Sequence, residues 1–236
     1  WGGVVFLPNS AGTLRGATIR RADKGVTIQT SSPTIDGNTI AEIQGAAGAL
    51  AGEDGQITVG IAALGTGTPQ ITDNVIEDLV AGAGAAGLKG ADSALSGGAA
   101  DDGTVGGSGG DVFGIYVVAG SKPTSTGNTI RRLSGGAGGD GGPVGNGLGC
   151  ALDRGGAPGG DGAAGAEGGD AYGIAVVGSD PTISGNTIAT LIAGSGGDAG
   201  AGGKAAVGCD GDSFFTDGGN GGDGGAGGVG GKGGDA

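Results

Sequence analysis

Apolar and polar residues alternate in a short pattern that returns several times along the chain. The clearest copy, residues 173–191, reads Gly-Ile-Ala-Val-Val, then a turn with proline, then an isoleucine, and finally Gly-Asn-Thr-Ile. Related copies span residues 25–43, 60–79 and 114–133, and an incomplete copy ends at Ile19. A period of two predicts β-strands whose apolar side chains share one face.

The spacing of the copies shows where the chain varies in length. The last isoleucines of successive copies are 21, 36, 54 and 58 residues apart. From the glycine that opens a copy to its last isoleucine, however, the distance is always 15 or 16 residues. The extra length therefore lies between copies, as in solenoids, whose insertions map to one face of a stacked repeat.

Each copy is therefore expected to form one coil of a right-handed parallel β-helix, an all-β solenoid that runs through residues 1–236 as one segment of a longer protein. Inward-pointing residues of neighbouring coils should stack into aliphatic ladders, and Ser125 interrupts one that is otherwise isoleucine. Charges after the last isoleucine change sign between coils, so Arg132 should face Asp78 and Arg21 should face Glu42. Such pairs would set the register of the coils.

The asparagine of the repeated motif is expected to sit at a turn and to bond to its equivalent one coil away. This predicts a structural ladder that closes one corner of the solenoid, in preference to a ligand site. Its members are Asn38, Asn74, Asn128 and Asn186.

Glycine supplies 67 of the 236 residues and is concentrated in four insertions, at about 44–56, 81–111, 134–170 and 193–236. The last insertion ends in Gly-Gly-X triplets, and a period of three is that of an extended left-handed helix without internal hydrogen bonds. Neighbouring insertions leave the same corner of the solenoid. We therefore expect a packed layer of polyglycine II helices beside the solenoid, with flexible loops as the alternative.

Two pairs of residues in the insertions are candidates for cross-links. Cys150 follows Asn128 by 22 residues and Cys209 follows Asn186 by 23, so stacking of the insertions would bring the two cysteines close enough for a disulfide. A disulfide would in turn indicate an oxidising, extracellular compartment. Asp111 and Asp170 both stand three residues before a strand glycine and could share a Ca²⁺ ion. A single match to a calcium-binding nonapeptide at residues 106–114 adds to that hypothesis, and solvated surface aspartates are the alternative.

The charge balance narrows the possible partners. The net charge of −13 disfavours nucleic acid and anionic membranes, and no apolar run is long enough to insert into a membrane. Histidine is absent. The first strand of each copy has an outward-pointing position that carries no charge. No catalytic carboxylate or base is therefore expected there, and the protein is not expected to be an enzyme. These positions are Thr27, Ala62, Tyr116 and Ala175.

The segments Trp1–Phe6, Gly12–Ile19, Gly25–Ile28 and Pro33–Ile40 resemble bacterial secreted right-handed parallel β-helix repeat proteins. That superfamily includes pectate-lyase-like enzymes and many surface proteins, but no lyase motif carries over to this chain. The Gly-Gly-X tracts are similar in kind to polyglycine II regions of phage tail-fibre adhesins and springtail antifreeze proteins.

These observations predict a non-enzymatic extracellular structural or adhesive module, part of a fibre or surface layer, that self-assembles end to end or through its glycine-rich layers. A carbohydrate-binding or polysaccharide-processing β-helix, contacting a surface glycan through its outer strand face, is one alternative. An ice-binding protein is another, although the many aspartates in the tracts disfavour it.

Overall fold

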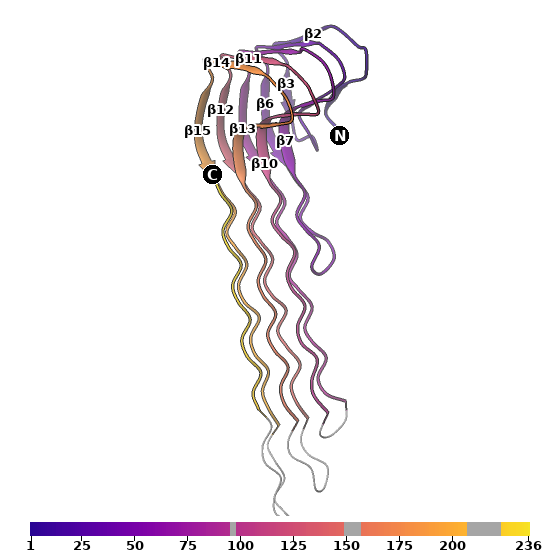
Figure 1. The fold of residues 1–236 in the computed structure, drawn as a ribbon, viewed down its shortest axis with the longest axis vertical. Helices are drawn as coiled ribbons and strands as arrows, with labels where there is room; N and C mark the ends of the chain where they lie inside the picture. The colour runs from indigo at the N-terminus through magenta and orange to yellow at the C-terminus, as the bar shows by residue number, and fades with distance from the viewer. Residues whose placement is uncertain (95–97, 149–156, 207–222) are drawn as a thin grey trace, which may run out of the picture.

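The computed structural model describes residues 1–94, 98–148, 157–206 and 223–236. Each coil contributes one strand to each of three parallel five-stranded sheets, which stack as a solenoid (Figure 1). Sheet A contains β1 (Val4–Phe6), β4 (Val26–Gln29), β7 (Thr58–Leu64), β10 (Val112–Val118) and β13 (Ala171–Val177). Sheet B contains β2 (Thr13–Arg15), β5 (Thr34–Asp36), β8 (Gln70–Thr72), β11 (Thr124–Thr126) and β14 (Thr182–Ser184). Sheet C contains β3 (Thr18–Arg20), β6 (Thr39–Gln44), β9 (Val75–Val80), β12 (Thr129–Ser134) and β15 (Thr187–Ile192).

The predicted parallel stacking of equivalent positions is confirmed. In sheet C, Ile130 pairs with Ile76 on one side and Ile188 on the other. Ile76 and Ile130 are fully buried, whereas Ile188 lies on the last coil and is 45% exposed. The core is thus a column of aliphatic side chains, and each coil covers the one before it.

One backbone feature lets sheet C place two apolar residues inward three positions apart. The residue two positions after each motif isoleucine has a positive φ, as at Asp78 (φ 55°) and Arg132 (φ 55°). This left-handed residue interrupts the alternation of faces, so both Ile76 and Leu79 point into the core and are fully buried. Strict alternation would have turned Leu79 toward solvent.

The exception in the isoleucine ladder of sheet B is accommodated by hydrogen bonds. Ser125 pairs with Ile71 and Ile183 in register and is 1% exposed. Its hydroxyl accepts a hydrogen bond from Asn128 Nδ2 (3.2 Å) and donates one to Asn186 Oδ1 (3.4 Å). A buried hydroxyl is tolerated here because both of its roles are satisfied.

Ion pairs form between coils where the alternation of sign predicted them. Arg132 contacts both Glu77 (2.7 Å) and Asp78 (2.6 Å), and Arg21 contacts Glu42 (3.1 Å). Hydrogen bonds from the arginines lower the pKa of Glu77 and of Asp78. The arginine side chains are exposed, so water screens these pairs and they serve mainly to align neighbouring coils.

Three strands of sheet A begin earlier than the sequence predicted. β7, β10 and β13 each start two residues before the glycine that was taken as the strand start. A Cβ on Gly114 would lie 2.6 Å from Gly173 O and 2.5 Å from Ile130 Cγ2. The glycine is therefore required for close approach to the core and the next coil, and it does not interrupt the strand.

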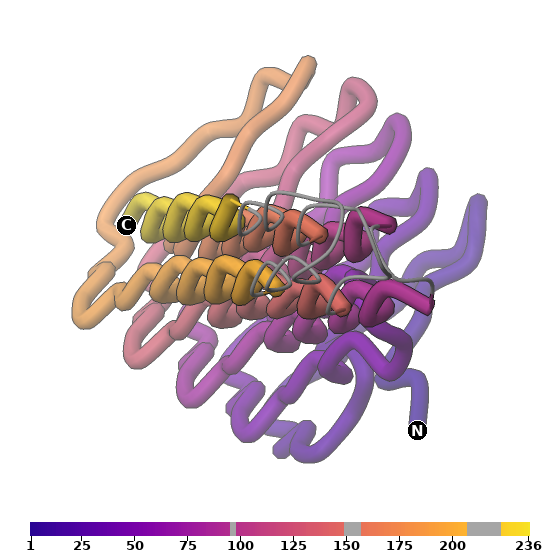
Figure 2. Tube along the Cα trace, turned by 90° about the horizontal axis from the view of Figure 1, so that it is seen from below, coloured from indigo at the N-terminus to yellow at the C-terminus, as the bar shows by residue number. Residues whose placement is uncertain are grey.

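The glycine-rich insertions extend away from the solenoid as paired legs (Figure 1). Each insertion has an outward leg, which follows a strand of sheet C, and a return leg. The outward legs are residues 45–50, 81–94, 135–148 and 193–206. The return legs are residues 53–57, 98–111, 157–170 and 223–236. Viewed from below, the legs lie in two rows (Figure 2). Two predicted boundaries shift slightly, because Gln44 and Ser134 still belong to β6 and β12.

Successive residues of a leg bond to different neighbouring legs. Gly162 N donates to Ala226 O (2.8 Å) in the next return leg, and Ala163 N donates to Gly142 O (3.3 Å) in the outward leg of its own insertion. Asp161 O accepts from Gly103 N (3.3 Å) in the preceding return leg. The same three directions recur every three residues, which joins the described legs into one hydrogen-bonded array.

None of the described segments forms a helix with the length and apolarity needed to cross a lipid bilayer.

Candidate functional site

The four motif asparagines lie in one column along the wall of the solenoid. The Nδ2 atom of Asn38 donates to Asn74 Oδ1 (3.0 Å), that of Asn74 to Asn128 Oδ1 (2.9 Å), and that of Asn128 to Asn186 Oδ1 (2.9 Å). The first three side chains are at most 1% exposed. Because these amides bond to one another and to backbone groups inside the wall, the column is a structural element.

Asp111 and Asp170 occupy equivalent positions on neighbouring return legs. Asp170 N donates to Asp111 Oδ1 (2.9 Å), and Asp235 N donates to Asp170 Oδ1 (2.7 Å). The Tyr172 hydroxyl donates to the other oxygen of Asp170 at 2.6 Å. Among the described residues, no group of three or more acidic, histidine or cysteine side chains is placed to hold a metal ion. Calcium binding at these aspartates stays a prediction.

The same arrangement recurs along the tracts. Asp102 accepts from the backbone N of Asp161 (2.7 Å), and Asp140 accepts from that of Asp198 (2.8 Å). In both cases an aspartate on the preceding leg accepts a hydrogen bond from the backbone of the next leg and so links the two legs. The sequence signal for this role was the recurrence of Asp at equivalent points of successive insertions.

Acid should loosen the array of legs. Hydrogen bonds from the backbone of the next leg lower the pKa of Asp92 and of Asp170. A carboxyl with a lowered folded-state pKa stabilises the fold above its unfolded pKa, about 3.9, and this contribution is lost as the pH falls through the folded value. We expect hydrogen exchange of tract amides, corrected for intrinsic rates, to accelerate below about pH 4.

Asp170→Asn is the matched control for this prediction, because the amide keeps the acceptor oxygen but does not titrate. Exchange near residue 235 should then respond less to pH than in the original chain. An equal response in both proteins would contradict the role assigned to the carboxylate.

Cys150 and Cys209 lie outside the described residues, and the disulfide between them stays a prediction.

The outer face of sheet A carries a cluster of aromatic rings. Val59, Phe113 and Tyr172 occupy the same register position on three neighbouring coils. The rings of Phe113 and Tyr172 stack with centroids 5.2 Å apart and planes 7° apart. The ring of Tyr116, three residues along the same strand, lies 4.7 Å from that of Phe113 at 31°. The three rings form one cluster outside the main core, in which Phe113 is buried and Tyr172 is 37% exposed.

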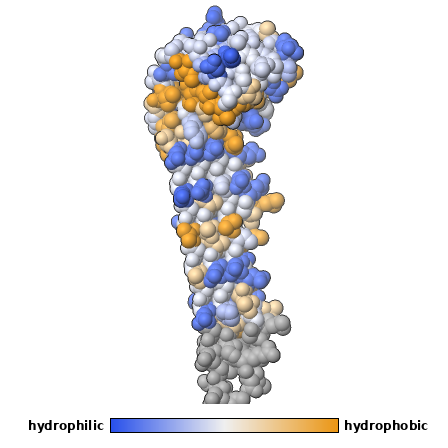
Figure 3. Space-filling model, in the orientation of Figure 1, coloured by the Kyte–Doolittle hydropathy of each residue, from blue (hydrophilic) through white to orange (hydrophobic). Residues whose placement is uncertain are grey.

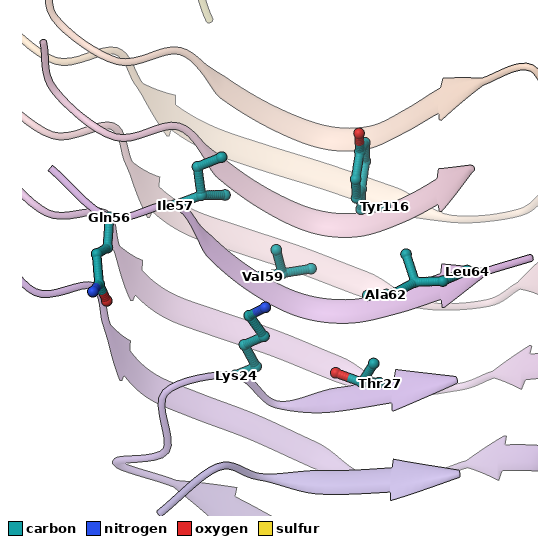
Figure 4. Close-up of a pocket in the computed structure, with 8 residues that line it drawn as sticks. All are labelled: Lys24, Thr27, Gln56, Ile57, Val59, Ala62, Leu64 and Tyr116. Atoms are coloured by element: carbon teal, nitrogen blue, oxygen red, sulfur yellow. The ribbon is translucent and has the colours of Figure 1, made fainter. Parts of the chain in front are cut away.

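Two adjoining cavities, of about 500 and 390 Å³, lie along this face and share Tyr116. Figure 4 shows the first cavity, with side chains from three neighbouring coils on one side of the sheet. The first is lined by Lys24, Thr27, Gln56, Ile57, Val59, Ala62, Leu64 and Tyr116. The second is lined by Asp111, Phe113, Tyr116, Tyr172, Ala175, Val176 and Val177. Together they form one groove, called the sheet A groove below.

The sheet A groove is mainly apolar, with charge at its ends. Lys24 lines one cavity and Asp111 lines the other. Figure 3 shows an apolar patch on the solenoid just above the tracts, whereas the tracts themselves carry alternating polar and apolar bands. An exposed apolar patch with polar groups at its rim is typical of an interaction site.

Part of the groove could be anticipated from the sequence. The uncharged outward positions Ala62, Tyr116 and Ala175 do lie on this face. Phe113 and Tyr172 were missed because each directly precedes the glycine that was taken as the start of its strand. Their shared position, one residue before that glycine in neighbouring copies, was the signal that could have revealed them.

Comparison with protein-family models finds no match, and comparison with curated proteins finds none either. Among solved structures, the chain is similar to a springtail antifreeze protein from Granisotoma rainieri, described as a nine polyproline type II helical bundle. The two chains are 24% identical over 79% of this chain and 92% of the other, with a TM-score of 0.24. At that TM-score the likeness is distant and carries no argument about this protein.

Proposed function

We propose that this protein is a non-enzymatic, extracellular structural or adhesive module that forms part of a fibre or surface layer. The observation that supports the proposal is the array of backbone hydrogen bonds that joins the described legs and anchors them to the sheets. An element whose neighbouring repeats are bonded along most of its length resists bending, which suits a stiff projection from a surface. In this proposal the solenoid is a right-handed β-helix like that of bacterial secreted repeat proteins.

The legs, in this proposal, are polyglycine II helices packed in two layers. The three-residue recurrence of the hydrogen-bond directions supports it, because such a helix has three residues per turn and bonds only sideways. Close packing supports it as well. A Cβ on Gly139 would lie 2.1 Å from Ala85 O, and one on Gly107 would lie 2.0 Å from Glu53 O. Such distances leave room for hydrogen alone, so the packed legs require glycine at these points.

An ice-binding role would need a regular, weakly charged face. The exposed positions of the return legs include Asp102, Asp161 and Glu167, whose charges interrupt such a face. A polysaccharide-processing role would need acidic or basic groups paired across the sheet A groove, whose lining is mostly apolar. The structural or adhesive role requires neither feature.

Four measurements on one preparation of the intact chain test the proposal. Beads coated with the protein should be retained on bacterial or host cell surfaces more than uncoated beads, and tract amides should be protected from hydrogen exchange as strongly as those of the sheets. Thermal hysteresis should be absent, and polysaccharides should not be cleaved. Cleavage or thermal hysteresis would overturn the proposal, and so would fast exchange throughout the tracts together with no retention of the beads.

A further inference from the structure

We propose that Leu88 and Thr104 close the exposed edge of the second insertion to any further glycine-rich leg, so that the array of legs does not widen on this side. The inference rests on the proposed function and deepens it, because it states where assembly through the glycine-rich layers is prevented. The edge lies between the first and second insertions, which differ in length.

The first insertion is shorter than the one that follows it (Figure 1). Its outward leg spans residues 45–50, whereas that of the second insertion spans residues 81–94. The preceding coil carries no insertion, since only five residues separate β3 from β4. Within the described chain, the far part of the second insertion therefore has a neighbouring insertion on one side only.

Backbone hydrogen bonds show where the cover by the first insertion ends. Ala83 O accepts from Gly48 N (2.9 Å), and Ala86 O accepts from Gly52 N (3.1 Å). Unpaired backbone groups along an edge are a template for pairing with another segment, so an uncovered edge requires protection. Four carbonyl oxygens farther along the two legs accept no hydrogen bond from a described residue, those of Lys89, Asp92, Asp102 and Val105.

Glycine is required wherever a leg of the preceding insertion lies alongside. A Cβ on Gly82 would lie 1.9 Å from Ala46 O of the first insertion. One on Gly142 of the third insertion would lie 1.9 Å from Leu88 O of the second. Leu88 lies on the same face of its leg as Gly82, but the first insertion does not reach it. Its side chain is 60% exposed and stands where a longer first insertion would run.

The return leg of the second insertion departs from glycine at the same level. A Cβ on Gly110 would lie 2.2 Å from Gln56 O of the first insertion. One on Gly107 would lie 2.0 Å from Glu53 O. Thr104 holds the next position, three residues farther from the solenoid, and its side chain is exposed. A side chain at a position that needs glycine under a neighbouring leg leaves no room for that leg.

Thr104 also satisfies a donor with which a further leg would otherwise pair. Three residues nearer the solenoid, Ala85 N donates to Glu53 O of the first insertion (2.9 Å). The equivalent amide of Leu88 donates instead to the Thr104 hydroxyl (2.6 Å). The edge thus supplies its own acceptor, and pairing with a further leg would require that this hydrogen bond be broken.

A lengthened first insertion tests the inference. Two Gly-Gly-Ala triplets are added after Gly48 and two more after Glu53, so that the turn between them is kept and both legs extend beyond Leu88 and Thr104. Because the added legs are tethered beside the edge, their effective concentration is high and they should pair wherever the edge permits.

With Leu88 and Thr104 in place, the added amides should exchange with solvent as freely as those of an unstructured peptide. In the Leu88→Gly, Thr104→Gly double variant, their exchange should slow about tenfold or more, because they gain hydrogen bonds to the edge. Val229→Gly in the lengthened chain is the matched control. It removes a side chain that is 75% exposed on another return leg, and the added amides should stay unprotected.

Thermal unfolding of each chain verifies that the fold is kept. The inference is overturned if the added amides are protected with Leu88 and Thr104 in place, or if they stay unprotected in the double variant. Its failure is distinguishable from failure of the proposed function, which is tested on the chain without added residues. Coated beads that are retained, with protected tract amides in that chain, would leave the structural or adhesive module standing and reject only the closed edge.

Discussion

Gly139→Ala should disrupt the array of legs. The new methyl group would lie 2.1 Å from Ala85 O, so the two outward legs would have to separate. Separation would strain the hydrogen bonds that Gly139 makes through its amide to Gly107 O and through its carbonyl from Ala166 N. We expect a loss of about 3 kcal/mol in local stability, at the upper end for overpacked sites. Hydrogen exchange of residues 81–94 and 135–148 should accelerate accordingly.

The control for this experiment is Gly227→Ala on the last return leg. A Cβ at Gly227 meets no atom within 4 Å. The substitution should leave hydrogen exchange unchanged or slow it slightly. Alanine lowers the conformational entropy of the unfolded chain, which stabilises the folded state by about 0.5 kcal/mol. If the two variants behaved alike, close packing between the legs would not be what excludes side chains from Gly139.

Asn128→Ala should cause the largest loss within the solenoid itself. Asn128 is fully buried and donates to Ile71 O (2.8 Å), while its Oδ1 accepts from both the backbone N (3.0 Å) and Nδ2 (2.9 Å) of Asn74. Alanine would leave those groups without partners at a site that has little access to water. With about 1–3 kcal/mol for each unpaired buried group, we expect a loss of about 4 kcal/mol in the free energy of unfolding.

Asn186→Ala provides the comparison, because it removes an equivalent amide from the last coil. Asn186 also accepts from the backbone N (3.0 Å) and Nδ2 (2.9 Å) of Asn128, but it is partly exposed. Water can replace the lost acceptor there, so a loss of about 1 kcal/mol is expected. Denaturant unfolding followed by circular dichroism measures both variants. Equal losses would show that burial does not determine the strength of the column.

The repeated motif was sufficient to predict the stacking of coils, because a solenoid makes only local demands. Each coil contacts the coils beside it, so spacing and alternation already determine which residues pair. Ile76, Ile130 and Ile188 could be aligned from their motifs alone. The ion pairs of Arg132 with Glu77 and Asp78 followed from the same alignment.

The sheet A groove was less predictable, because it depends on a local exception to a general rule. Glycine usually weakens or interrupts a strand. Gly114 instead continues β10, since its missing side chain makes room for Ile130 and the next coil. Phe113 and Tyr172 therefore lie on the sheet, where their rings meet those of other coils.

The coil, its register and the position of the insertions could be predicted from the sequence, because these follow from the spacing of side chains along the chain. The pairing of the legs and the role of the aspartates depend on the folded chain, since a backbone amide at Asp170 or Asp198 acquires its partner from a leg about 60 residues away. The aromatic cluster on sheet A has the same origin. Phe113 and Tyr172 are separated along the chain by a whole insertion, and only stacking of the coils brings their rings together.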